Sequence, residues 1–208
     1  MSKNLKMNLP LTQKDNEEFL IRLYFDLTEG SKKAAAKRAY RDFSRTLRDL
    51  SKDEKEKRRV KNELENILLE QIEIVLNQSF RNQEEFDFWH QKTCEKLRKS
   101  SDKLKLTIGQ AQKWVNMTLK YMYVLKEERI EGINKNIRFF HIPIDNIIQE
   151  KFAQERKMWK LRDPWSKVDS YSIYLDYQKQ VRENYKEEIP FVVEFRLFNE
   201  GATKHLFT

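Results

Sequence analysis

The most regular pattern in the sequence is an apolar stripe near residues 64–76. Its members recur at helical spacing, which places them on one face of an α-helix. They are Leu64, Ile67, Leu68, Ile72, Val75 and Leu76. Ser51 and Glu54 stand at capping-box spacing just before them. The pattern predicts one long helix over residues 52–78. A coiled-coil partner helix is the lesser alternative, because the stripe spans fewer than about four clean heptads.

Turn-forming residues are scarce, with 4 Gly and 4 Pro among 208 residues, so few positions interrupt a helix. The 13 Phe, 8 Tyr and 4 Trp supply enough bulky surface for a core. We therefore expect a mainly α-helical, compact multi-helix protein. The length suits a single domain over 1–208, or two lobes at about 30–100 (basic) and 101–208.

Periodicity and start signals predict further helices in several places. They lie at about residues 12–27, 82–99, 110–125, 146–156 and 166–185. The polar stretch 126–138 reads as a connection. Residues 191–198 follow a proline and are β-branched and aromatic, which predicts either one short strand or an apolar tail laid on the helices.

The positive charge is concentrated in one segment. The chain carries a formal charge of +8, and residues 31–60 hold twelve Lys/Arg against five Asp/Glu. Arg38, Arg41 and Arg45, followed by Arg48, step along one helix face. Such a stripe predicts contact with the phosphates of DNA, or of another polyanion. The competing interpretation is a solvated face with local Asp–Arg pairs.

Several classes of chemistry are disfavoured. The single Cys94 excludes an internal disulfide and suits a reducing, cytoplasmic compartment. We find no apolar leader, no membrane-length apolar run, no phosphate-binding glycine loop and no His/Cys cluster with metal spacing. We accordingly expect no cofactor, no metal and no membrane.

Residues 106–145 contain the most suggestive arrangement. Gly109 opens the helix predicted at 110–125, and one face of that helix is polar. The polar face carries Gln112, Lys113, Asn116 and Lys120. After Pro143 the chain is expected to be extended, with Asp145 as the N-cap of the next helix.

The segments Leu106–Lys113 and His141–Ile148 resemble the helix-hairpin-helix DNA glycosylase superfamily. In that family a glycine hairpin binds a DNA phosphate, and an aspartate at a following helix start acts near the flipped nucleotide. The resemblance implies a DNA-repair hydrolase that cleaves an N-glycosidic bond. Ala111 stands where lyase-competent members have a lysine, which implies a monofunctional enzyme.

The resemblance also implies site residues. Asp145 would be the catalytic carboxylate. Gly109, Gln110 and Lys113 would hold a phosphate, with Gln112, Asn116, Lys120, Arg38, Arg41 and Arg45 as further DNA contacts. Trp159, Trp165 and Tyr171 are in sequence range to line the base pocket.

Two other functions stay open on the sequence. One is a non-enzymatic module that binds DNA, RNA or an anionic protein through the same cations, with Asp145 as a plain N-cap. The other is a helical protein that oligomerises through its apolar stripe and tail. The damaged base, the choice between DNA and RNA, and the oligomeric state are not indicated.

Overall fold

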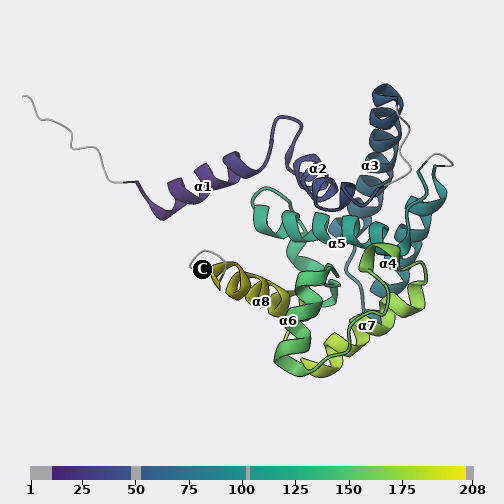
Figure 1. Ribbon diagram of the computed structural model, residues 1–208. Helices are drawn as coiled ribbons and strands as arrows, with labels where there is room; N and C mark the ends of the chain where they lie inside the picture. Colours follow the sequence, from purple (N-terminus) through teal and green to yellow (C-terminus); the bar gives the residue numbers. More distant parts are fainter. Residues whose placement is uncertain (1–10, 48–52, 102–103, 205–208) are drawn as a thin grey trace, which may run out of the picture.

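The computed structural model describes residues 11–47, 53–101 and 104–204, and it is mainly α-helical, as predicted (Figure 1). Its α-helices are α1 (Gln13–Tyr24), α2 (Ser31–Ser44), α3 (Glu54–Asn77), α4 (Gln83–Lys99), α5 (Ile108–Leu125), α6 (Asn146–Arg156), α7 (Tyr171–Asn184) and α8 (Pro190–Lys204). Two short 3-10 helices, η1 (Ile133–Phe139) and η2 (Trp165–Lys167), lie between them.

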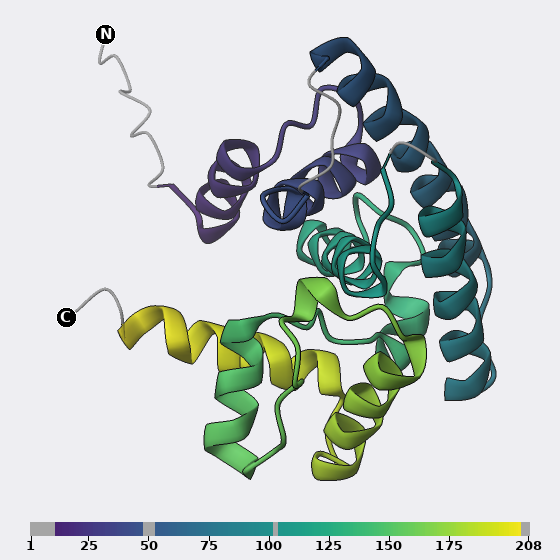
Figure 2. The same ribbon diagram turned by 45° about the vertical axis from the view of Figure 1, so that its right-hand side comes forward.

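Helix α5 is the centre of the molecule. Figures 1 and 2 show α2 on one side of it, α3 and α4 on another, and the C-terminal helices α6, α7 and α8 on a third. All its residues except Tyr123 and Val124 are buried. The buried apolar side chains of both halves of the chain form one cluster around this helix.

Helix α2 packs closely on α5 because its inner face is built from alanines. Ala35, Ala36 and Ala39 are fully buried and leave room for the large Trp114 side chain. The Trp114 indole N–H donates to the Ala36 carbonyl oxygen at 3.0 Å, and its ring lies 5.5 Å from Phe43. This contact satisfies the one polar atom of the indole inside the core.

Capping residues in the sequence determine where most of the helices begin. Thr12 and Thr107 cap α1 and α5 through capping boxes, and Asp145 caps α6 as predicted. Two expectations differ from the structure. Asp53 is the N-cap of α3, while Ser51 lies outside the described residues. The helix predicted at about residues 166–185 begins later, at Tyr171 after Ser170, because residues 165–167 form η2.

The C-terminal segment is a helix, and the part of the chain that the structure describes contains no strand. Pro190 occupies the first helical position, where its missing N–H costs no hydrogen bond. Phe191, Glu194 and Leu197 follow at intervals of three and are buried, which is helical periodicity. The prediction of a short strand relied on β-branched and aromatic composition, and the packing of α8 overrides it.

Helix α1 projects from the body, and none of its residues is buried (Figures 1 and 2). Among the described residues, every helix is too short or too polar to cross a bilayer.

Candidate nucleic-acid interface

Gly109 lets η2 approach the start of α5. A Cβ atom at this position would lie 1.7 Å from the Trp165 carbonyl oxygen, so a larger side chain does not fit. The Gly109 N–H donates to the Val168 carbonyl oxygen at 2.8 Å, and the Gln110 N–H donates to the Thr107 hydroxyl oxygen. Both N–H groups are therefore used inside the protein, so the phosphate contact expected at this turn lacks free backbone donors.

The amides on the polar face of α5 hold the segment before α6. The Gln112 side-chain amide donates to the carbonyl oxygens of Gly109 and Ile144, and the Asn116 amide donates to that of Ile142. Both side chains are buried, although the sequence suggested an open polar face. Their role in the structure is to fix the extended residues that carry Asp145.

Asp145 is held by two contacts. Its Oδ1 accepts from the Ile148 N–H at 2.8 Å, and its Oδ2 lies 2.6 Å from the Lys113 ammonium. Burial alone would raise the pKa of this carboxyl. The Lys113 charge and the Ile148 hydrogen bond outweigh it and lower the pKa, so Asp145 is ionised at neutral pH. The side chain stays 26% exposed.

Asp145 lines a pocket of about 330 Å³ between α1, α2, α5 and α8. The pocket contains four cations, three carboxylates and several aromatic rings. Its lining residues are Tyr24, Arg41, Asp42, Arg45, Lys113, Met117, Lys120, Tyr121, Asp145, Glu194 and Phe198. Two of the cations, Lys113 and Lys120, are buried and paired with Asp145 and Glu194.

A second pocket of about 310 Å³ shares Arg45 with the first. It lies at the start of α5 and adds Lys105 and Lys167. Arg41, Arg45, Lys105 and Lys167 are exposed, and none forms an ion pair with another residue that the structure describes. We call the two adjoining pockets with these four cations the basic groove.

The arginine stripe of α2 divides into two parts. Arg41 and Arg45 face the basic groove, whereas the Arg38 guanidinium lies 4.0 Å above the Tyr24 ring centre. Arg48 is outside the described residues. Asp42 accepts a hydrogen bond from the Tyr121 hydroxyl at 2.6 Å and forms no ion pair with a neighbouring arginine in the described part of the chain.

The three aromatic residues expected around a base lie apart and do not line the Asp145 pocket. Trp165 lies next to a residue of the pocket lining, with its ring centre 5.9 Å from the Lys113 nitrogen. Trp159 packs edge-on against Tyr177. The Tyr171 hydroxyl is buried against the His90 ring.

Sequence reasoning missed the aromatic rings that do line the pocket, which are Tyr24, Tyr121 and Phe198. Tyr24 falls in the helix predicted at about residues 12–27, with no sign that it faces a pocket, and Phe198 falls in the segment predicted as a strand or an apolar tail. The spacing of Glu194 and Phe198, one helical turn apart, is the signal that would have put both side chains on one face of a helix.

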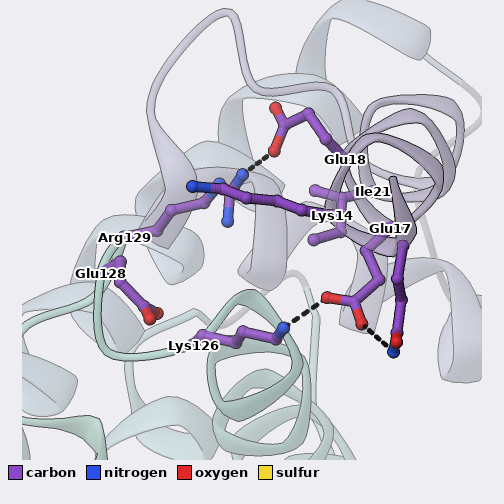
Figure 3. A pocket seen from close by; sticks show the side chains of 8 residues that line it. Lys14, Glu17, Glu18, Ile21, Lys126, Glu128 and Arg129 are labelled. Carbon is purple, nitrogen blue, oxygen red and sulfur yellow. Dashed lines mark hydrogen bonds and ion pairs between the residues drawn. The ribbon is translucent and has the colours of Figure 1, made fainter. Parts of the chain in front are cut away.

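Another pocket, of about 680 Å³, lies under α1 and has a balanced set of charges (Figure 3). Glu17 pairs with Lys126 at 2.5 Å, and Glu18 pairs with Arg129. The two cations, Lys126 and Arg129, lie just after α5. With its main charges paired to each other, this pocket offers little to an anion. Its effect is to fix α1 beside the basic groove.

A buried hydrogen-bond chain on the other side of α5 includes both described histidines. His141 Nε2 donates to Asp87 at 2.6 Å, and the Tyr174 hydroxyl lies 2.8 Å from His141 Nδ1. Burial lowers the pKa of His141 and that of His90, so both rings are neutral. Within residues 11–47, 53–101 and 104–204, no three His, Cys, Asp or Glu side chains are grouped to hold a metal ion.

Comparison of the chain with family models, with curated proteins and with solved structures finds no match. The basic groove is therefore the feature of the molecule that bears on its function.

Proposed function

We propose that this protein binds DNA and that the phosphate backbone lies along the basic groove. The observation that carries the proposal is the convergence of four exposed cations, unpaired in the described structure, from separate segments. Arg41 and Arg45 come from the end of α2, Lys105 from the loop before α5, and Lys167 from η2. Cations without carboxylate partners can replace the counterions of a polyanion.

The competing interpretation of the arginine stripe was a solvated face balanced by local Asp–Arg pairs. Asp42 is the aspartate nearest in sequence to Arg41, and it is engaged by the Tyr121 hydroxyl instead. The charge of Arg41 and Arg45 is thus left available to a ligand, which favours the phosphate-binding interpretation.

The test is the affinity of a fluorescently labelled DNA oligonucleotide, measured by anisotropy. Replacing Arg41 and Arg45 together by Ala should weaken binding by roughly 10- to 100-fold at low salt, because two phosphate contacts are lost. Arg162→Ala is the matched control, since this exposed arginine lines neither pocket. Equal affinities of the wild type and the double variant would refute the proposal.

Base excision is a second candidate function, favoured by the position of Asp145. An ionised carboxylate fixed at the lining of a pocket beside cations can stabilise the positive charge that develops on a sugar when its N-glycosidic bond breaks. The target nucleotide would have to leave the duplex and enter this pocket. Unpairing and unstacking it costs a few kcal/mol.

This candidate is tested with duplexes that carry assorted modified bases, followed by detection of alkali-labile sites. Asp145→Asn keeps an N-cap for α6 but removes the charge. It should abolish product while DNA binding persists. Asp169→Asn serves as the control, because Asp169 is exposed and pairs with Arg98 outside the pocket. Product formation by Asp145→Asn at the wild-type rate would eliminate an essential role for this carboxylate.

A further inference from the structure

Two exposed aromatic side chains line the same pocket as Arg41 and Arg45. Tyr24 ends α1 and Phe198 lies on α8, and each is 44% exposed. Figures 1 and 2 show both helices to the left of α5, with α1 above and α8 below. Phosphate binding alone needs no aromatic surface, so the two rings indicate a ligand with a flat apolar part as well as negative charge.

Hydrogen bonds fix the Tyr24 ring. The Tyr121 hydroxyl donates its only hydrogen to Asp42 at 2.6 Å, so the Tyr24 hydroxyl, 3.0 Å away, must donate to the Tyr121 oxygen. The Arg38 guanidinium lies over the same ring. The ion pairs of α1 with Lys126 and Arg129 add a further constraint (Figure 3). A ring held in place this way loses little entropy when a ligand stacks on it.

Phe198 is placed by a buried ion pair. Lys120 is held by Glu194 at 2.6 Å, and its ammonium lies 4.7 Å from the Phe198 ring centre. Each exposed ring of the pocket therefore has its own cation, Arg38 for Tyr24 and Lys120 for Phe198. Arg41 and Arg45 are left for a second, anionic part of the ligand.

We propose that the pocket takes an unpaired base of single-stranded nucleic acid, with the base against Tyr24 and Phe198 and the adjoining phosphates on Arg41 and Arg45. This inference rests on the proposed function and adds the kind of strand. In a duplex the faces of the bases are covered by their neighbours. In a single strand they are free to stack on aromatic side chains beside a basic groove.

The experiment compares three labelled ligands of equal length by anisotropy at one salt concentration: oligo(dT), oligo(U) and a DNA duplex. The wild type should bind a single strand about 10-fold or more tighter than the duplex. Tyr24→Leu should weaken single-strand binding by about 5- to 150-fold, because a stacked base is lost. Tyr24→Phe keeps the ring and should retain most of the affinity, which separates stacking from damage to α1.

The control is Phe88→Leu, because Phe88 is a 61% exposed ring on α4, outside the groove. Duplex binding as tight as single-strand binding, or no effect of Tyr24→Leu, overturns this inference while the arginine test still supports the proposed function. If the wild type binds none of the three ligands, the proposed function itself fails. Tighter binding of oligo(U) than of oligo(dT) supports the single-strand inference and overturns DNA as the source of the strand.

Discussion

Lys113 and Lys120 lie two turns apart on α5, and each holds one carboxylate from a distant part of the chain. Asp145 is 32 residues from Lys113 and Glu194 is 74 residues from Lys120. Helical spacing predicted that both lysines share a face with Gln112 and Asn116. It could not predict that this face is buried, because the groups that satisfy it come from other elements.

The Lys120–Glu194 pair gives a stability prediction. Glu194→Leu removes one partner and leaves a buried ammonium, so the free energy of unfolding should fall by about 3–5 kcal/mol. The double variant Lys120→Met, Glu194→Leu should be within about 1 kcal/mol of the wild type, since no charge is left buried. Urea unfolding of the three proteins measures both effects.

The matched control is the exposed pair Lys32–Glu73, in which both side chains are more than two-fifths exposed. Glu73→Gln should cost less than about 1 kcal/mol. A double variant at 120 and 194 as unstable as the single one would show that the cost of Glu194→Leu comes from lost packing and not from an orphaned charge.

The buried histidines give a pH prediction. Burial lowers the pKa of His90 and His141 below the unfolded value of about 6.5. The unfolded chain therefore binds more protons below that pH, and stability from these two rings is present above about pH 6.5 and is lost as the pH falls. Burial raises the pKa of Glu65 and of Glu194, so the contribution of these two groups to stability is lost as the pH rises and opposes that of the histidines. Because the two effects on stability oppose each other, the histidine pKa values are best measured directly, by NMR titration of the rings.

In the folded protein both rings should titrate below the ordinary histidine pKa. An apparent pKa at or above 6.5 for either ring would contradict the burial argument.

At the scale of elements, the sequence predicted those helices that carry their own start signals. Asp145 and Asn82 begin α6 and α4 where expected. For α8 the sequence was ambiguous, because Phe191, Val192 and Val193 favour a strand by composition. What makes this segment helical is the burial of one face against the body of the molecule, which no local pattern states.

The close approach of η2 to the start of α5 predicts that a side chain at Gly109 destabilises the protein. Gly109→Ala places a Cβ against the Trp165 carbonyl oxygen and should destabilise the protein by about 3 kcal/mol. Thermal unfolding measures the change. Asp176→Ala, at an exposed position of α7, should shift stability by less than about 0.5 kcal/mol. A Gly109→Ala protein as stable as the wild type would show that η2 does not need this close approach.

At the scale of the whole molecule, the helical fold class could be predicted, and the basic groove only in part. The arginines of α2 were recognised from their spacing, and Asp145 from its position after Pro143. Their meeting in one pocket depends on how α1, α2, α5 and α8 pack, and so does the contribution of Tyr24 and Phe198. Contacts between segments this far apart leave no periodic signal in the sequence.

Binding of phosphates by Arg41 and Arg45 should appear in the dependence of oligonucleotide affinity on salt concentration. A plot of the logarithm of the binding constant against the logarithm of the salt concentration has a slope set by the number of phosphates neutralised. The wild type should show a steep negative slope, and the slope of the Arg41→Ala, Arg45→Ala protein should be shallower by about 1.5–2. Identical slopes for the two proteins would contradict phosphate binding by Arg41 and Arg45.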